Sequence, residues 1–370
     1  MPTLPSHMRA IVTTGHGGLD RLVYREDVPV PVAGPGQVLI EVGACGLNNT
    51  DLNTRTGWYA STVKSGMTEE IGTRGVASET LAAWSGAPVK FPIIQGADAV
   101  GRIVAVGPGA SHLRIGERVM VDPCVRDPKR PARARSTAYI GSEIGGGYAE
   151  YAAVPASNAF RVVSSLSDAE LATFACSYST AEEMLTRVRL EAGETILVTG
   201  ASGGVGSAHL QLAKLRGARI IAVAGAAKEA RIRTLGADHV IPRERRDLAA
   251  AVRELVGSEG VDVVADVVGG EQFIDMLRVL RRGGRYVSAG AIAGPVPSID
   301  LRDLIYKDLE MHGVANPEEE TFRRLVRLIE AGDIKPLLER TYPLERLREA
   351  QADFMKKAHV GNLVIAIRAS

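Results

Sequence analysis

Short runs of apolar or alternating residues, separated by Gly and Pro clusters, fill the first part of the chain. Such runs are typical of β-strands, in which neighbouring side chains point to opposite faces. We expect strands at residues 9–14, 37–45, 99–107, 117–122 and 148–154. Short strands at regular spacing with turn signals between them predict a β-rich, partly open, barrel-like domain.

Two segments interrupt this pattern. Residues 60–90 have weak periodicity and many small polar residues, and we interpret them as a long inserted loop with room for one helical turn. A loop of this length is typical of a lid or a mobile segment. Residues 127–147 form a second irregular segment, which we interpret as a solvated loop with a basic cluster.

The pattern changes near residue 165, where apolar residues take helical spacing. Ser167 is a candidate helix N-cap, with Glu170 three residues further on. Apolar strands then alternate with amphipathic helices, which predicts a doubly wound parallel sheet of the α/β class. The strands are expected at 195–200, 218–224, 238–241, 261–268 and 284–290. The helices between them are expected at 207–217, 227–237 and 273–284. The last elements are expected to be helices at 319–337 and 344–358 and a strand at 362–367.

Size and charge narrow the possible functions. The 370 residues suit two domains better than one core. The net charge of +1 offers no one-signed field for nucleic acid or an anionic membrane. The three cysteines (Cys45, Cys124 and Cys176) are far apart, so we expect no disulfide framework and a reducing compartment. Because we find no signal-peptide core and no run of about 18 apolar residues, we expect a cytoplasmic protein without a membrane span.

A glycine-rich turn at residues 200–206 joins the strand at 195–200 to the helix at 207–217. Its glycines permit a tight turn and a close approach of the backbone to a pyrophosphate, and the helix N-terminus supplies free amides. The strand before the turn and the helix after it favour dinucleotide binding over an ordinary tight turn. The expected contacts in the turn are Gly200, Ser202, Gly203, Gly204, Val205 and Gly206.

The second strand of this region bears on the choice between NAD and NADP. An NAD site usually has Asp or Glu at the end of that strand, whereas this strand ends in small neutral residues, 223–227. Lys228 follows at once, and Arg243 and Arg245 come after the third strand. We therefore predict NADPH, with Lys228 as the leading contact to the 2′-phosphate and Arg243 as a second. The alternative is that these cations belong to an ordinary helix and loop surface.

Together, these segments resemble the medium-chain dehydrogenase/reductase superfamily over nearly the whole chain. The matching segments are GPGQVLIEVGACGLNNTDLNTRTGWY, FPIIQGADAVGRIVAVG, GERV, GGYAEYAAV, TGASGGVGSAHLQLAK, LGADHVI and GNLVIAI. Within the superfamily, GLNNTDLNTRTGWY is similar to the quinone-oxidoreductase branch, which carries Asn where zinc enzymes carry Cys. The resemblance implies a catalytic domain made of residues 1–176 and 315–370 and a Rossmann dinucleotide-binding domain at 177–314.

The resemblance also bears on metal binding. It places the family's three catalytic zinc ligands at Asn48, Ala97 and Cys176, of which only Cys176 is an ordinary ligand. A catalytic zinc site keeps three protein ligands. Cys124 alone lies in the region of the structural zinc lobe, which needs four cysteines. We therefore expect no metal.

Candidate catalytic residues follow from the same segment. The resemblance implies that Asn48 donates a hydrogen bond to a substrate oxygen, that Thr50 stands at the family's proton-relay position, and that the Tyr59 phenol donates a proton. The alternative is that Asn48 and Tyr59 only line the cleft. Asp51 is expected to make a structural hydrogen bond, and Cys176 to be an inert core thiol.

The remaining expectations concern the cofactor, the substrate and the assembly. The resemblance implies that Thr180 packs behind the nicotinamide, that strand-end loops contribute Val268, Gly290 and Ala291, and that two chains pair through edge segments Pro297–Leu301 and Leu309–Val314. The expected function is NADPH-dependent, zinc-free hydride transfer to a quinone, enone or related small carbonyl compound. The alternatives are an alcohol dehydrogenase of the zinc type with a remodelled metal site and a catalytically weak NADPH-binding regulatory protein. The 60–90 insertion follows Tyr59 directly, so the known substrates of this branch are a poor guide to the substrate of this chain.

Overall fold

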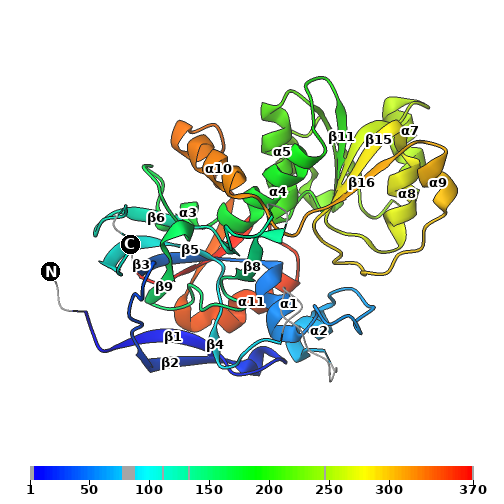
Figure 1. The fold of residues 1–370 in the computed structure, drawn as a ribbon. Helices are drawn as coiled ribbons and strands as arrows, with labels where there is room; N and C mark the ends of the chain where they lie inside the picture. Colours follow the sequence, from blue (N-terminus) through cyan, green and yellow to red (C-terminus); the bar gives the residue numbers. More distant parts are fainter. Residues whose placement is uncertain (1–3, 77–87, 111, 132–133, 246, 369–370) are drawn as a thin grey trace. The chain divides into compact units, whose positions relative to one another are not determined.

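The computed structural model describes residues 4–76, 88–110, 112–131, 134–245 and 247–368. The chain divides into two compact units, shown as a ribbon in Figure 1. Unit 1 comprises Met1–Val63, Thr68–Cys176 and Phe322–Ser370, and unit 2 comprises Lys64–Met67 and Ser177–Thr321. The short segment Lys64–Met67 lies within the 60–90 insertion, so part of that insertion belongs to unit 2.

Unit 1 is built around a seven-stranded sheet in the order β10-β6-β5-β3-β18-β17, with β9 paired to β3. The long strand β3 is central because it pairs with β5, β9 and β18, and most of its residues are buried. The C-terminal strand β18 pairs antiparallel with β3, so the end of the chain returns to the first sheet. The strands are β3 (Gln37–Leu47), β5 (Asp98–Val106), β6 (Arg118–Val121), β9 (Tyr151–Pro155), β10 (Ala159–Arg161), β17 (Leu338–Pro343) and β18 (Asn362–Ala366).

Smaller elements complete unit 1. A second sheet has the order β2-β1-β4, and β7 and β8 form a hairpin. Ser167 and Glu170 form the predicted capping box at the start of α3. These elements are β1 (His7–Thr13), β2 (Leu22–Pro29), β4 (Ile93–Ile94), β7 (Cys124–Arg126), β8 (Ser136–Tyr139), α1 (Asn49–Thr56), α2 (Glu69–Arg74), α3 (Asp168–Leu171) and α11 (Leu347–Met355).

The structure corrects the sequence-based interpretation of unit 1 in two places. The segment 127–147 is not wholly irregular, because β8 pairs antiparallel with β7. A helix, α1, follows Asn48 although its residues are mostly polar and give no apolar periodicity. Local capping explains the start of this helix, since the backbone N–H of Asn48 donates to the Asp51 carboxylate over 2.8 Å. Gly57, at φ 81°, ends it.

Unit 2 contains a six-stranded parallel sheet in the order β13-β12-β11-β14-β15-β16. This is the doubly wound arrangement, so the predicted fold class is confirmed. In Figure 1, α5 lies on one side of this sheet and α7 and α8 lie on the other. The strands are β11 (Thr195–Val198), β12 (Arg219–Ala224), β13 (His239–Pro242), β14 (Val261–Asp266), β15 (Leu280–Ser288) and β16 (Glu310–Gly313). The helices are α5 (Gly204–Leu215), α6 (Glu229–Thr234), α7 (Leu248–Val256), α8 (Phe273–Arg278) and α9 (Leu301–Ile305). Two further helices, α4 (Ala175–Arg187) and α10 (Glu319–Ala331), each include residues of both units.

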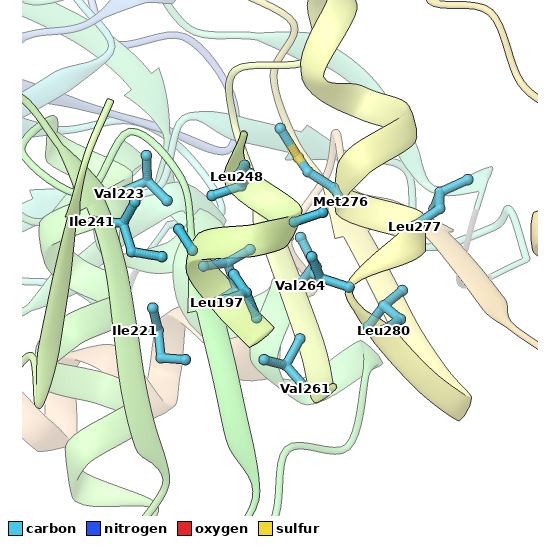
Figure 2. Close-up of a cluster of buried hydrophobic side chains, with 14 of the residues drawn as sticks. Leu197, Ile221, Val223, Ile241, Leu248, Val261, Val264, Met276, Leu277 and Leu280 are labelled. Atoms are coloured by element: carbon cyan, nitrogen blue, oxygen red, sulfur yellow. The ribbon is translucent and has the colours of Figure 1, made fainter. Parts of the chain in front are cut away.

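A core of buried apolar side chains fixes α7 and α8 on the sheet of unit 2 (Figure 2). Leu248 and Met276 come from these helices, and Leu197 and Val264 come from the strands below them. The helix expected at 273–284 ends at Arg278, because the following residues join β15 and Leu280 pairs with Val261. Among the described residues, no helix is long and apolar enough to cross a membrane.

Candidate active site

The glycine-rich turn of unit 2 lies between β11 and α5, at the carboxyl edge of the parallel sheet. Gly200 adopts φ +56°, which makes the turn possible. A Cβ atom at Gly206 would lie 2.2 Å from the Gly200 carbonyl oxygen, so only glycine lets the helix pack this closely. A Cβ atom at Gly203 would meet only the Gly200 oxygen, at 3.6 Å, which leaves the outer face of the turn open. Closed packing at Gly206 and an open face at Gly203 match the roles of a dinucleotide turn.

Lys228 reaches this turn from the end of the neighbouring strand. Its ammonium group lies 3.1 Å from the Ser202 hydroxyl. The structure thus brings together two residues that the sequence nominated separately, and it places a positive charge beside the turn.

An acid that the sequence analysis missed lies at the same edge. The Glu244 carboxylate accepts a hydrogen bond of 3.3 Å from the Ala226 amide, just after β12. Arg243 pairs with it over 3.4 Å, while Arg245 turns to Glu254. Backbone hydrogen bonds and Arg243 hold the pKa of Glu244 below its usual value, so it is ionised at neutral pH. An acidic side chain, that of Glu244, therefore lies at the end of β12, where the sequence of this strand alone indicates only neutral residues. It comes from the loop after β13.

A second missed acid, Asp266, organises the strand ends. It is fully buried at the end of β14. It accepts hydrogen bonds from the hydroxyls of Thr199 and Tyr286, at 2.5 and 2.6 Å. It also accepts from the amides of Val268 and Gly269, at 2.8 and 3.0 Å. One carboxyl group thus fixes the loop after β14 against two neighbouring strands.

The loops after β14 and β15 are packed backbone against backbone. The Ala293 amide donates to the Val268 carbonyl over 2.8 Å, and Gly270 donates to Gly294 over 3.1 Å. A Cβ atom at Gly290 would lie 2.9 Å from the Val267 carbonyl oxygen. The predicted contacts Val268, Gly290 and Ala291 therefore lie in two adjoining loops, whereas Thr180 lies on α4 and is partly exposed.

In unit 1, two of the predicted catalytic residues contact each other. The Tyr59 hydroxyl donates to the Thr50 hydroxyl over 3.1 Å. Burial raises the pKa of Tyr59 to about 12, so its phenol remains protonated at neutral pH. Both side chains are partly exposed. The pair is therefore a neutral hydrogen-bond donor within reach of solvent.

The third predicted residue, Asn48, belongs to a buried polar group. It lies against Asp98, which is 1% exposed and accepts a 3.0 Å hydrogen bond from the Cys176 amide. Burial raises the pKa of Asp98 to about 8, and the nearby Asp51 contributes to the rise. Burial also raises the pKa of Asp51 to about 7. At neutral pH this group therefore carries much less negative charge than two free carboxylates would.

Tyr139, which the sequence did not nominate, fills the space next to Ala97. The two side chains and Cys124 form one buried cluster. The Tyr139 hydroxyl donates to the Cys176 sulfur over 3.3 Å, and burial holds the pKa of Tyr139 well above its usual value. A phenol from the β7–β8 hairpin thus packs against Ala97 and Cys176, two of the three positions that the resemblance assigns to zinc ligands. Among the described residues, no group of three or more His, Cys, Asp or Glu side chains could hold a metal ion.

Arg55 ties the start of the insertion to its surroundings. Its guanidinium group is fully buried and donates to the carbonyls of Gly17 and Gly72 and to the Gln351 side chain, at 2.7, 2.6 and 2.9 Å. Burial lowers the pKa of Arg55 to about 10, so it stays charged at neutral pH. Its position is structural, because it joins α1, α2, α11 and the N-terminal loop.

Comparison with known proteins adds an independent line of evidence. Residues 34–164 match the alcohol dehydrogenase GroES-like domain, and residues 204–331 match the zinc-binding dehydrogenase family. The chain is 30% identical to the quinone oxidoreductase of Mus musculus over 96% of both chains. It is 27% identical to an NAD-dependent alcohol dehydrogenase of Sulfolobus acidocaldarius, covering 92% of this chain and 95% of that one.

Two solved structures show the same fold. A candidate alcohol dehydrogenase from Sinorhizobium meliloti 1021 is 50% identical, with a TM-score of 0.89, and the match covers 99% of this chain and 98% of that one. The mycobacterial protein Rv1454c, solved in complex with NADPH, is 27% identical with a TM-score of 0.77, over 97% of this chain and 99% of that one.

Proposed function

Since the chain belongs to the medium-chain dehydrogenase/reductase superfamily and is quinone-oxidoreductase-like, and is thus an oxidoreductase, we propose that it reduces a quinone, enone or related small carbonyl compound with NADPH and without a metal. The observation that carries the proposal is the polar cluster of unit 1. There, Tyr139 packs beside Ala97, the residue that the resemblance aligns with a zinc ligand, and donates a hydrogen bond to Cys176, which supports a site that works without metal.

The donor set of this cluster does not fit zinc. Asn48 offers a neutral amide and Ala97 offers no donor, while the Cys176 sulfur already accepts a hydrogen bond from Tyr139. Zinc in a catalytic site is held by three nitrogen, sulfur or carboxylate ligands. We therefore assign no step to a metal. Metal analysis of the purified chain tests this directly, and about one zinc per chain would favour the rival, a zinc-type alcohol dehydrogenase with a remodelled site.

The residues of unit 1 would bind and orient the substrate oxygen. Reduced nicotinamide, when bound, supplies the hydride. Tyr59 and Thr50 form a protonated pair that can donate to a developing oxyanion, and the Asn48 amide is the second candidate donor. No charged acid is needed for this role, because the product anion of a quinone or enone is delocalised. A turnover screen with quinones, enones and simple aldehydes tests the substrate class. If nothing turns over although NADPH binds, the chain is the catalytically weak regulatory protein of the second alternative.

Two charges next to the glycine turn would decide the cofactor. Lys228 lies beside Ser202 and is placed to contact a 2′-phosphate, and Arg243 adds a second positive charge. Glu244 opposes this preference, because a carboxylate at the end of β12 suits the ribose hydroxyls of NAD. We place NADPH first, since Arg243 pairs with Glu244 while Lys228 remains next to the turn.

Fluorescence titration of NADPH and NADH with two variants tests this assignment. Lys228→Ala removes one charge-assisted phosphate contact and should weaken NADPH binding by about 10- to 150-fold, with little change for NADH. Glu244→Gln should strengthen NADPH binding, by about fivefold at most because the group is exposed. If Glu244→Gln instead weakens NADH strongly and wild-type protein prefers NADH, the cofactor is NAD.

We further propose that two chains associate through the edge of the unit 2 sheet. Strand β16 is the edge strand, and Met311 on it is 42% exposed. Leu301, Ile305 and Tyr306 near it are 58%, 59% and 71% exposed. Exposed apolar groups along an unpaired edge are typical of an interface. A monomeric mass in light scattering at micromolar concentration would contradict this proposal.

A further inference from the structure

The segment Lys64–Met67 is the part of the insertion that belongs to unit 2, although the residues on both sides of it belong to unit 1. We call this segment the strap. The Met67 amide donates to the Ile292 carbonyl over 2.8 Å, and the Met67 side chain is 8% exposed. The second half of the strap, Gly66 and Met67, is therefore packed onto the loop after β15, whereas Lys64 and Ser65 are exposed.

Gly66 makes this packing possible. A Cβ atom there would lie 2.6 Å from the Ile292 carbonyl oxygen and 2.7 Å from the Ala293 carbonyl carbon. Both atoms belong to the backbone, so they cannot move aside as the end of a flexible side chain can. The contact between strap and loop is thus a close backbone-to-backbone approach that requires glycine.

The loop under the strap is itself stacked on a second loop. The Ala293 amide donates to the Val268 carbonyl, and Gly269 and Gly294 form an isolated β-bridge. A Cβ atom at Gly270 would lie 2.8 Å from the Ala293 Cβ atom. Three backbone segments are therefore stacked in order: the strap contacts the loop 289–294, and this loop contacts the loop 267–270. Asp266 fixes the innermost layer through the amides of Val268 and Gly269.

The two inner layers follow β14 and β15, at the carboxyl edge of a doubly wound sheet. Ligands of such sheets bind in the crevice at this edge. We infer that the strap is a positioning element of the cofactor site, which holds the loop 289–294 in place and so slows the release of NADP(H). This inference rests on the proposed function, because it takes these two loops to contact the nicotinamide half of the cofactor.

The physical reason is that a loop held on one side only can open. Release of a cofactor needs the loops around it to move apart, and such local opening is governed by the contacts that must break. The strap adds a hydrogen bond from the Met67 amide and the close backbone contact of Gly66 to the loop 289–294. Without these contacts the loop opens more often. This should raise mainly the dissociation rate of the cofactor and leave its association rate nearly unchanged.

Gly66→Ala tests the inference, with Gly145→Ala as the matched control. Gly145 is exposed, and a Cβ atom there would meet nothing within 4 Å. NADPH is displaced by excess NADP⁺ in a stopped-flow instrument, and the loss of nucleotide fluorescence gives the dissociation rate. We expect Gly66→Ala to raise this rate by about tenfold, a change carried by dissociation, and Gly145→Ala to leave it unchanged.

Hydrogen exchange of the cofactor-free protein gives a readout that does not need NADPH. In the Gly66→Ala variant, peptides covering 289–294 should exchange faster, while peptides from the core strands β3 and β11 should exchange as in wild type. Faster exchange throughout unit 2 would mean general destabilisation and would overturn the assignment of a local role. If wild-type protein does not bind NADPH, the proposed function fails. If it binds NADPH and Gly66→Ala releases it at the wild-type rate, the strap has no role in cofactor retention and the inference fails.

Discussion

Replacing Asp98 by Asn should change how the stability of the protein depends on pH. Asp98 is almost completely buried, and its pKa is raised from its usual value near 4 to about 8, mainly by burial. The folded state therefore holds a proton on Asp98 between pH 5 and pH 8, whereas the unfolded state does not. Where the folded state binds more protons, stability falls as pH rises.

The size of the effect follows from this difference of one proton. A difference of one bound proton costs the wild-type protein roughly 1–2 kcal/mol for each pH unit in this range, so the total loss from pH 5 to pH 8 is on the order of 4 kcal/mol. Asn resembles the protonated carboxyl in shape and carries no charge. Asp98→Asn should thus have little effect or a small cost at pH 5 and should be more stable than wild type at pH 8 and above.

Urea unfolding at pH 5, 6, 7 and 8 measures this difference, with unit 1 as the part expected to respond. Asp51 interacts electrostatically with Asp98, so its own pKa falls when the Asp98 charge is removed, which adds to the stability gained at high pH. The other titrating groups are shared by the two proteins, and their contributions cancel in the difference between wild type and variant. Asp333→Asn serves as the control, because Asp333 is exposed. Parallel stability curves for wild type and Asp98→Asn would refute the reasoning, since they would mean that Asp98 titrates alike in the folded and unfolded states.

Two further predictions concern Tyr59 and Arg55. Tyr59→Phe should lower kcat by about 100-fold or more if the phenol assists protonation, and NADPH affinity should stay nearly constant. A rise in KM at unchanged kcat would show that the phenol only positions the substrate. No change in either constant would remove Tyr59 from the catalytic residues. Arg55→Met should destabilise the protein by about 3–5 kcal/mol, because it leaves three buried acceptors without their charged donor. Arg74→Met, at an exposed ion pair on α2, should cost much less in the same urea titration, and equal losses would contradict the role given to Arg55.

Local patterns predicted much of the fold, since most elements carry their own signal. The alternation of apolar strands and helices predicted the parallel sheet of unit 2, and Ser167 with Glu170 predicted the start of α3. The α1 helix gave no such signal, because its residues are polar and a capping contact between Asn48 and Asp51 starts it. A pattern search that looks for apolar periodicity does not find a helix of this kind.

The residues missed at the candidate site share a different cause. Glu244 lies far from the end of β12 in the sequence, and the pairing of Ala224 with Pro242 brings it there. Inspection of the end of β12 alone therefore indicates a neutral pocket. Tyr139 was missed in the same way, because the pairing of Cys124 with Tyr139 in the β7–β8 hairpin sets its ring beside Ala97. Both positions depend on strand register, which one sequence does not reveal.

The electrostatics of unit 1 favour a particular class of substrate. Asp51 and Asp98 have raised pKa values, and Tyr59 and Tyr139 remain protonated, so at pH 7 the cluster carries much less negative charge than two free carboxylates would. A neutral donor such as the Tyr59–Thr50 pair stabilises a developing oxyanion less than a dication does. It is therefore poorly suited to the localised alkoxide formed from a simple aldehyde. The anion formed from a quinone or an enone spreads its charge over several atoms and needs less stabilisation at the oxygen. A site of this kind should thus turn over quinones and enones much faster than aldehydes of similar size.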